Sequence, residues 1–350
     1  MSFLSLFNAQ GNNSIYIIAE IGGNFTTYAE GVKLIDAAKE AGVDCVKLQT
    51  YRADTLTTKT AVFDMENTGK IRQYDFFKKY ELSKEIHREI FDYARKNRLD
   101  WFSTPAHQAD VDMLDSLGVG AFKIGADDAV NIPLLKYIGK KGLPIFFSTG
   151  MCTLKEIKCS LAAILDTGND KIVILHTVSG YPTYPEHVNL NAIKTLQLEF
   201  PEFPIGFSDH TFSPLASISA AAMGARVIER HFTLSKDAAG PDHALSSDPQ
   251  EMRYLVESIR VIEKMLGSGI KEPIGPEIKN LINNRKSIVA IKGIKKNEVF
   301  NSDNLSIKRP GSGIQPKFFE EIIGRRAGRD IKEDTLISWD DISEDGKPRS

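Results

Sequence analysis

Eight short apolar stretches, each ending in polar residues, are the feature that most constrains the fold of this chain. The segments between them, such as residues 31–41 and 84–96, carry apolar residues at helical spacing. Near-continuous apolar runs are typical of strands buried on both faces of a parallel sheet. Eight strand–helix units in succession predict a (β/α)8 barrel, or TIM barrel. We expect its strands at residues 16–20, 45–49, 101–104, 121–125, 144–149, 172–176, 205–210 and 227–231.

The polar residues at the ends of these runs favour a functional site. In (β/α)8 barrels the active site lies at the mouth formed by the C-terminal ends of the strands. Strands must end somewhere, and polar ends alone are unremarkable, but here all eight are polar and several carry ionisable groups. The residues in question are Glu20, Lys47, Gln49, Ser103, Thr104, Lys123, Ser148, Thr149, His176, Thr177, Ser208, Asp209, His210, Glu229, Arg230 and His231.

The barrel pattern fades near residue 268, and we divide the chain into three parts. Residues 1–268 are the predicted barrel, residues 269–284 a Gly- and Pro-rich linker, and residues 285–350 a small second domain. Within the second domain we expect a strand at 287–291 and a short helix at 316–323. The long polar segment 52–80 interrupts the barrel pattern and is interpreted as a surface excursion that serves as a lid or an oligomer contact.

Composition narrows the class of partner and the compartment. The net charge of −2 and the lack of a basic stripe argue against a nucleic-acid partner. The longest apolar stretches are too short to span a bilayer, so no membrane association is expected. The first residues lack the basic start and long apolar run of a signal peptide. Three cysteines without a CxxC pair fit a reducing, cytoplasmic setting.

His210 and His231 end two consecutive predicted strands and can both point into one barrel mouth. Neutral imidazole is a common ligand of divalent transition metals, and two protein nitrogens leave coordination positions open for water and substrate. The alternative is that both histidines form hydrogen bonds without a metal. The neighbouring carboxylates of Asp209 and Glu229 favour the metal, because carboxylates orient imidazole ligands or act as bases.

Lys47 and Lys123 lie within apolar strands, where an ammonium group is costly unless it meets an opposite charge. Two such lysines facing one cavity indicate a phosphate or carboxylate ligand. The hydroxyl groups of Ser148, Thr177 and Ser208 are of the kind that surrounds a phosphate. A Schiff-base aldolase with Lys123 as nucleophile is a competing interpretation.

Ten short motifs occur in order along the chain. They are IIAEIGGN (17–24), KLQT (47–50), FSTP (102–105), KIG (123–125), STGM (148–151), GYPT (180–183), GFSDHT (206–211), ERHFT (229–233), GPDHALS (240–246) and KRPGSG (308–313). One such motif carries little information, whereas ten in order over nearly the whole chain are specific. Together they resemble the sialic acid synthase family.

The resemblance implies a (β/α)8 barrel followed by a small, β-rich domain similar to type III antifreeze proteins, the SAF domain. Members of the family are transferases that condense phosphoenolpyruvate with N-acetylmannosamine or a related amino sugar. The product is a nine-carbon 2-keto acid, and phosphate is released. A divalent metal, Mn²⁺ or Mg²⁺, is required. The implied assembly is a domain-swapped homodimer, in which the small domain of one chain covers the barrel mouth of the other.

The resemblance also implies roles for individual residues. His210 and His231 match the metal ligands of the family, and Glu20 and Glu229 match candidates for activating the water that attacks C2 of phosphoenolpyruvate. The matched residues that hold phosphoenolpyruvate are Lys47, Lys123, Ser148 and Ser208, and those that contact the sugar are Gln49, Tyr181, Asp242 and the tail residue Arg309.

Departures from the family pattern concern the sugar more than the chemistry. Ala126 lacks a hydroxyl that contacts phosphate in the family, and Asp128 stands where a longer glutamate contacts the sugar. Ser179 replaces a frequent asparagine, Phe25 a frequent histidine, and His176 a cysteine. Since one methylene group at a sugar contact changes specificity by about 10- to 200-fold, the identity of the acceptor stays open.

Several alternatives therefore remain beside an N-acetylneuraminate-type synthase. In one alternative the enzyme is a legionaminic or pseudaminic acid-type synthase. In another its acceptor is a sugar 6-phosphate. Outside this class are the Schiff-base aldolase and a non-catalytic carbohydrate-binding protein. Two further histidines are placed outside the site, His87 on the surface and His243 in a solvated loop.

Overall fold

The computed structural model describes residues 3–7, 14–65, 69–240 and 242–343 of the 350-residue chain. These residues belong to two compact units, Met1–Gly267 and Ser268–Ser350. The boundary falls beside the start of the linker that the sequence predicts at residue 269.

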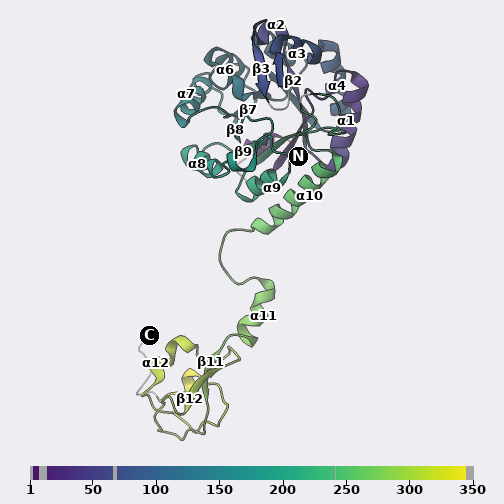
Figure 1. The fold of residues 1–350 in the computed structure, drawn as a ribbon. Helices are drawn as coiled ribbons and strands as arrows, with labels where there is room; N and C mark the ends of the chain where they lie inside the picture. The colour runs from purple at the N-terminus through teal and green to yellow at the C-terminus, as the bar shows by residue number, and fades with distance from the viewer. Residues whose placement is uncertain (1–2, 8–13, 66–68, 241, 344–350) are drawn as a thin grey trace. The chain divides into compact units, whose positions relative to one another are not determined.

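The first unit is a closed barrel of eight parallel strands surrounded by helices, which confirms the predicted (β/α)8 fold (Figure 1). All eight predicted strands are present. Around the barrel they follow the order β1, β10, β9, β8, β7, β6, β5, β2. Their bounds are β1 Tyr16–Glu20, β2 Cys45–Thr50, β5 Asp100–Pro105, β6 Phe122–Ile124, β7 Ile145–Ser148, β8 Ile172–Thr177, β9 Ile205–Asp209 and β10 Val227–His231.

Among the described residues, eight helices cover the barrel, and local sequence signals fix where several of them begin. Thr27, Thr153 and Asp248 each accept a hydrogen bond from the backbone of a glutamate three residues later, whose side chain bonds back to the cap residue. The helices are α1 Tyr28–Ala41, α4 Lys84–Lys96, α5 Gln108–Ser116, α6 Ile132–Gly139, α7 Leu154–Leu165, α8 Asn191–Glu199, α9 Leu215–Ala222 and α10 Pro249–Leu266.

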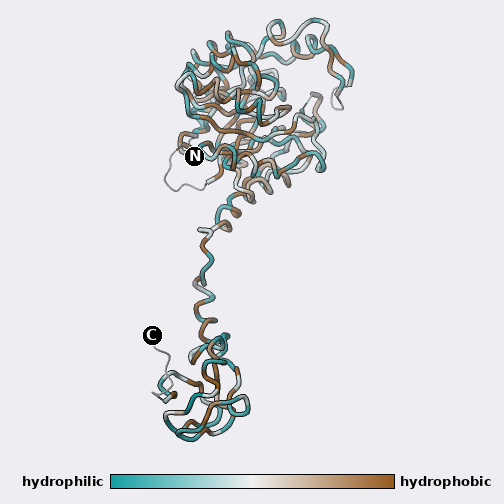
Figure 2. The backbone as a smooth tube through the Cα atoms, turned by 90° about the vertical axis from the view of Figure 1, so that its left-hand side faces the viewer, coloured by the Kyte–Doolittle hydropathy of each residue, from teal (hydrophilic) through white to brown (hydrophobic). Residues whose placement is uncertain are grey.

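Alternation along the strands gives the barrel two separate apolar layers. One set of strand residues packs among itself and contains Tyr16, Phe102 and Phe146, with the Phe102 and Phe146 rings stacked 4.7 Å apart. The other set packs against the helices. Hydrophobic segments accordingly run through the inside of this unit in Figure 2. The set that contains Tyr16, Phe102 and Phe146 fills the inside of the barrel. Polar side chains are therefore left to the mouth at the C-terminal ends of the strands.

The segment after β2 has more structure than the predicted surface excursion. It contains α2 (Ala53–Leu56), the antiparallel hairpin β3 (Val62–Met65) and β4 (Gly69–Arg72), and α3 (Gln73–Tyr80). The hairpin forms a two-stranded sheet of its own and does not pair with the barrel. No residue of α3 is buried, so this helix is not part of the hydrophobic core.

The second unit begins with the exposed helix α11 (Gly275–Asn283), which lies within the predicted linker. The antiparallel strands β11 (Ser287–Ala290) and β12 (Leu305–Lys308) follow, and then α12 (Phe319–Ile322). The predicted strand at 287–291 and helix at 316–323 are thus present. A separate apolar core of isoleucines and Phe300 holds the unit together. Short 3₁₀ turns in the chain span Phe3–Phe7, Ala126–Asp128, Pro185–His187, Pro316–Phe318 and Trp339–Asp341.

None of the helices within the described ranges is both long and apolar enough to cross a bilayer. The three cysteines are free thiols, with Cys45 buried inside the barrel.

Candidate active site

Strand register brings charged side chains from neighbouring strands to one level of the barrel mouth. Glu20, the last residue of β1, is the register partner of Lys47 on β2 and of His231 on β10. On the next pair, Glu229 of β10 is opposite Ser208 of β9. Because residues two apart on a strand point to the same face, the polar ends meet inside the barrel mouth.

Two lysines and two glutamates form a buried ionic network at the floor of the mouth. Nζ of Lys123 lies 2.8 Å from Oε1 of Glu229, and Nζ of Lys47 lies 3.8 Å from the same oxygen. Lys47 also pairs with Glu20 and donates a hydrogen bond to Oγ1 of Thr104. Ser208 donates a 3.0 Å hydrogen bond to Glu229. All four charged side chains are at most 6% exposed, which meets the predicted need of the strand lysines for opposite charges.

The network gives the carboxylates of Glu20 and Glu229 different pKa values. Burial alone would raise the pKa of Glu229, but Lys123 and Lys47 outweigh this effect and hold it at about 2. For Glu20 burial wins over its pairing with Lys47, and the nearby charge of Glu229 adds to it, so the pKa is raised. Burial also lowers the pKa of Lys123 despite its bond to Glu229. Glu229 is therefore a fixed anion, while Glu20 is the more basic carboxylate.

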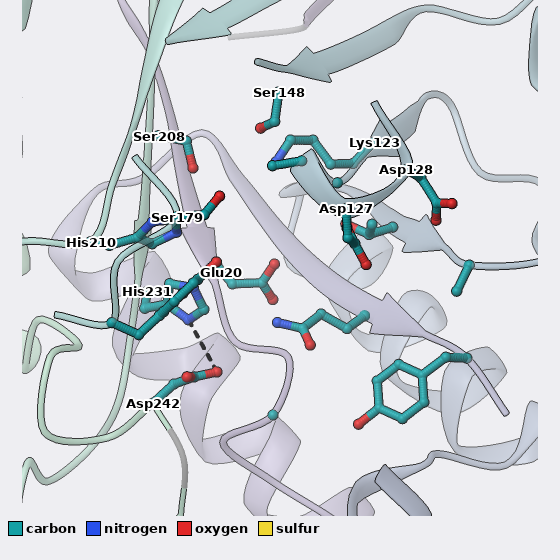
Figure 3. Close-up of a pocket in the computed structure, with 18 of the residues that line it drawn as sticks. Glu20, Lys123, Asp127, Asp128, Ser148, Ser179, Ser208, His210, His231 and Asp242 are labelled. Carbon is teal, nitrogen blue, oxygen red and sulfur yellow. Dashed lines mark ion pairs between the residues drawn. The ribbon is translucent and has the colours of Figure 1, made fainter. Parts of the chain in front are cut away.

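The side chains of His210 and His231 lie next to each other in Figure 3. Their ring centroids are 5.5 Å apart, and the ring planes are tilted by 52°. Nδ1 of His210 lies 2.9 Å from the carbonyl oxygen of Val178. A carbonyl only accepts, so Nδ1 donates and Nε2 keeps its lone pair. Burial lowers the pKa of both histidines, and for His231 the proximity of His210 lowers it further. Both rings are thus held in the neutral form that binds metals.

The donor set fits a divalent cation that takes further ligands from water and substrate. Nδ1 of His231 is buried without a hydrogen-bond partner, and Oδ2 of Asp242 lies 3.6 Å from it. Burial and the charge of Glu20 raise the pKa of Asp242 to about 7. Over the described part of the chain, no three His, Cys, Asp or Glu side chains are arranged to hold a metal by themselves. Two imidazoles with open positions are what a Lewis-acid site requires.

A cavity of about 500 Å³ connects these groups, and most of the predicted site residues line it. This size is within the range of small-molecule sites. Figure 3 shows Asp127 and Asp128 on one side of the cavity and His210, His231 and Asp242 on the other. The predicted residues that line the cavity are Glu20, Lys47, Gln49, Lys123, Asp128, Ser148, Ser179, Tyr181, Ser208, His210, Glu229, His231 and Asp242.

The prediction of a catalytic role for Asp209 is corrected by the structure. Its side chain points away from the cavity, because its neighbours Ser208 and His210 point inward. Oδ2 of Asp209 binds Nη1 of Arg230 at 2.8 Å and accepts a hydrogen bond from Ser217 of α9 at 2.6 Å. Asp209 therefore belongs to a buried structural ion pair behind the barrel wall.

Arg230 uses the rest of its guanidinium group to tie two loops of the mouth together. Its Nη2 donates to the carbonyl oxygen of Thr211 at 2.7 Å, and its Nε donates to Oγ of Ser247 at 2.6 Å. Thr211 follows the metal-ligand candidate His210, and Ser247 ends the loop that carries Asp242. This planar, multiply bonded cation fixes the position of both site residues.

Arg309 lies in the second unit, directly after β12, and is exposed. Its predicted contact with the sugar depends on an assembly of chains and stays a prediction.

Two histidines were predicted wrongly. His87 is fully buried, with Nδ1 bonded to the carbonyl oxygen of Ser83 and Nε2 2.8 Å from Oγ1 of Thr50. His243 is 8% exposed and lies 2.6 Å from Oγ1 of Thr233. Both fall in stretches whose sequence looks polar, and a single imidazole among charged residues gives no sign of burial.

Sequence reasoning also missed part of the cavity lining. Thr104 was among the polar strand ends and was given no role, and Asp127 stands next to the predicted residue Asp128, so a signal was available for both. The aromatic residues of segment 52–80 were not expected to line the site. The helical spacing of Phe76, Phe77 and Tyr80 was a sign that one face of this segment is apolar. Two more aromatic residues of the lining are Phe63 and Tyr51, which directly precedes the segment.

Comparison with known proteins agrees with this geometry. Residues 34–271 match the NeuB family, and residues 285–343 match the SAF domain. The chain is 43% identical to an uncharacterized protein of Methanocaldococcus jannaschii, over 93% of this chain and 94% of the other. It is 39% identical to N,N'-diacetyllegionaminic acid synthase of Legionella pneumophila (93% and 94% covered). It is 33% identical to N-acetylneuraminate-9-phosphate synthase of Homo sapiens (96% and 95%).

Among solved structures, the chain resembles the sialic acid synthetase of Leptospira borgpetersenii in complex with citrate. The TM-score is 0.71 at 31% identity, over 77% of this chain and 91% of the other. The family match covers more than half of the chain, and the relatives match over nearly their whole length. The chain therefore belongs to the NeuB family of sialic, legionaminic and pseudaminic acid synthases, and carries a SAF domain after its catalytic barrel.

Proposed function

We propose that this enzyme condenses phosphoenolpyruvate with the open-chain form of an N-acetylated hexosamine. C3 of phosphoenolpyruvate forms a bond to the sugar aldehyde carbon, water adds to C2, and phosphate leaves. The product is a nine-carbon 2-keto acid. The observation that carries the proposal is a single cavity with buried lysines at one place and two adjacent neutral imidazoles at another.

The lysine end of the cavity suits an anionic three-carbon donor. Lys123 and Lys47 supply two buried cations, and the hydroxyl groups of Ser148 and Ser208 line the same end. In such a site charge-assisted hydrogen bonds to phosphate and carboxylate are strong, because little water competes for them. These residues would hold the donor and fix the direction in which its C3 faces the acceptor.

His210 and His231 would hold Mn²⁺ or Mg²⁺, which when bound polarises the carbonyl group of the acceptor. The lone pair left on Nε2 of His210 and the free Nδ1 of His231 support this role. Asp242, whose Oδ2 lies 3.6 Å from the same nitrogen of His231, would meet a hydroxyl of the sugar.

Of the two carboxylates that the sequence left open, Glu20 is the better candidate for the base that activates water. Glu229 is bonded to Lys123 and Ser208 and is held as an anion of low basicity. Glu20 has the raised pKa, so it gains more from accepting a proton. Glu229 would instead keep Lys123 and Lys47 charged for the donor.

The acceptor is N-acetylmannosamine or the corresponding sugar of a legionaminic or pseudaminic acid-type synthase, and both have support among the similar proteins. The human relative, in contrast, is named for a phosphorylated product. A sugar 6-phosphate fits the cavity less well. Among the described lining residues, the cations are Lys47 and Lys123 at the floor, whereas Asp127, Asp128 and Asp242 line the remainder. A second phosphate would therefore meet carboxylates.

Two further properties belong to this proposal. The assembly is a homodimer in which the SAF domain of each chain brings Arg309 to the barrel mouth of the other. The compartment is cytoplasmic, which the three free thiols support.

A Schiff-base aldolase remains a second candidate because burial lowers the pKa of Lys123, as a nucleophilic amine requires. The 2.8 Å bond to Glu229 opposes it by stabilising the ammonium form. Borohydride treatment in the presence of pyruvate separates the two, since only an aldolase yields a reduced adduct on Lys123.

The test of the proposed function is a reaction of the full chain with phosphoenolpyruvate, Mn²⁺ and a panel of N-acetylated hexosamines. The readouts are released phosphate and the mass of the product. We expect one phosphate per molecule of nine-carbon acid with at least one acceptor, and none without acceptor. The proposal is contradicted if no acceptor in the panel leads to phosphate release. It is also contradicted if phosphate is released equally well without an acceptor.

A further inference from the structure

Five aromatic rings from the segment around 51–80 form one wall of the cavity, and the chemistry proposed above uses none of them. We call these residues the aromatic wall: Tyr51, Phe63, Phe76, Phe77 and Tyr80. Their rings contact one another edge to face, with centroids 5.1 Å apart for Tyr51 and Phe77 and 5.4 Å apart for Phe63 and Phe76. The wall is thus a connected surface and not a set of scattered side chains.

The spacing of the wall on α3 is that of an apolar helix face. Gln73, Phe76, Phe77 and Tyr80 stand at i, i+3, i+4 and i+7, and all four line the cavity. Such a face usually packs into a hydrophobic core, yet α3 has no buried residue. The amide oxygen of Gln73 is already committed to the hydroxyl of Thr57. The face therefore presents mainly rings to whatever fills the cavity.

None of the described charged residues of the same segment lines the cavity, and several of them pair with one another. Lys78 lies 2.8 Å from Glu81, Arg72 lies 2.7 Å from Asp75, and Arg52 lies 3.5 Å from Glu81. The aromatic wall consequently offers no ionic partner to a ligand. The lysines and glutamates of the cavity floor are nearly fully buried. Four residues of the wall are only half-buried and therefore lie nearer the opening, namely Phe63, Phe76, Phe77 and Tyr80.

An acceptor whose aldehyde lies at the two histidines would reach this wall, because the histidines and the five rings line the same cavity. A hydroxyl group against phenyl rings loses its hydrogen bonds to water without gaining a partner, whereas a methyl group gains apolar contact. The carboxylates of Asp127 and Asp128 line the same cavity and can accept hydrogen bonds from amide N–H groups. The cavity thus combines a surface for methyl groups with acceptors for N–H groups.

We propose that the aromatic wall selects acceptors whose end remote from the aldehyde is deoxygenated and N-acylated, in preference to the fully hydroxylated sugar. This inference rests on the proposed function and specifies its substrate class. Phe76 and Phe77 each contact three other rings of the wall, and we take Phe76 as the specificity-determining residue because it also joins Tyr80 to the rest.

The test compares three acceptors at saturating phosphoenolpyruvate and Mn²⁺: N-acetylmannosamine, its 6-deoxy analogue, and the 6-deoxy analogue with a second acetamido group at C4. We expect kcat/KM of the wild-type chain to rise at least about tenfold from the first to the third. Phe76→Ala should lower kcat/KM about tenfold for the two deoxy acceptors, through KM, and less than about threefold for N-acetylmannosamine. The KM of phosphoenolpyruvate should stay unchanged.

Two matched variants exclude a general effect on folding. Phe76→Leu keeps apolar bulk and should restore most of the preference. Tyr74 is on the same helix, but its hydroxyl group donates a hydrogen bond to Asp54 and its ring does not line the cavity. Tyr74→Ala should therefore leave the preference intact. A thermal melt and the KM of phosphoenolpyruvate report whether the barrel of each variant is folded.

The outcomes separate this inference from the proposed function. If N-acetylmannosamine is the best acceptor of the wild-type chain, or Phe76→Ala slows all acceptors equally, the inference is wrong while the function stands. An equal loss with all acceptors would instead mark the wall as a contact for a second chain or as purely structural. If no acceptor yields phosphate, the proposed function fails, and the inference with it.

Discussion

At the scale of single residues, the direction of each side chain on its strand decides its role. Glu20, Lys47, Lys123 and Glu229 face into the mouth and form one network, whereas Asp209, one residue beyond Ser208, faces the helices. A shift of one residue along a strand changes the face, so an ionisable residue next to a site residue is most often outside the site.

His87 allows a pH prediction at this scale. Its Nδ1 donates to the carbonyl oxygen of Ser83, so Nε2 must be unprotonated to accept from the hydroxyl of Thr50. Burial lowers its pKa below the ordinary value of 6.5. The unfolded chain therefore binds a proton below pH 6.5 that the folded chain does not, and stability is lost as the pH falls, by up to about 1.4 kcal/mol per pH unit.

The measurement is chemical unfolding of the wild-type chain and the His87→Gln variant between pH 7.5 and 5. Glutamine is neutral throughout, so the variant should lose less stability on acidification, whatever its stability at pH 7.5. Parallel curves for the two proteins would show that His87 does not titrate in this way.

The sequence predicted the inward-facing residues well because period-two alternation and ordered motifs both identify them. It predicted Asp209 wrongly because the motif that contains it also contains two site residues on the opposite face. His87 was misplaced for a different reason. His87 on α4 is buried against Thr50 of β2, which in turn bonds Ser103 of β5. Partners so distant in the sequence leave no trace in the local pattern.

At the scale of elements, the eight strands and the long helices could be predicted, and segment 52–80 could not. Buried parallel strands and amphipathic helices repeat a signal over many residues. The hairpin β3–β4 has four-residue strands and pairs only with itself, so its signal is short and its stability depends on contacts with α3. Phe63 of β3 meets Phe76 and Phe77 of α3, and these are tertiary contacts.

The independence of this hairpin leads to a prediction. The backbone N–H of Gln73 bonds to the carbonyl oxygen of Ala61 at 3.0 Å, so a short Gly-Ser linker can replace residues 62–72. We expect the melting temperature to change by less than about 3 °C, because no barrel strand loses a partner. The KM of the acceptor should rise about tenfold with loss of the Phe63 ring. A large drop in melting temperature would show instead that the hairpin supports the barrel.

At the scale of the whole molecule, the candidate site lies in the barrel unit, and one proposed sugar contact, Arg309, lies in the second unit. The barrel holds the ionic floor, the imidazole pair and the aromatic wall, whereas Arg309 belongs to the SAF unit. We expect Arg309→Ala to raise the KM of the acceptor more than that of phosphoenolpyruvate.

Complementation tests whether chains share their sites. Arg309→Ala and His210→Ala proteins are co-expressed with different tags, and the mixed dimers are purified from the random mixture. The purified mixed dimers should have about half of wild-type activity, because each contains one complete site of two. The unseparated random mixture should have about a quarter, because about half of its dimers are mixed. Purified mixed dimers without activity would show that each chain completes its own site.

The central claim is that His210 and His231 hold a divalent cation beside the donor site. Its most direct test is the equilibrium binding of Mn²⁺, followed by electron paramagnetic resonance with and without phosphoenolpyruvate. We predict one Mn²⁺ per chain in the wild-type protein. We also predict that His210→Gln and His231→Gln each weaken binding at least about tenfold, while Asp209→Asn, outside the cavity, weakens it less. Undiminished Mn²⁺ binding by the double histidine variant would contradict the account.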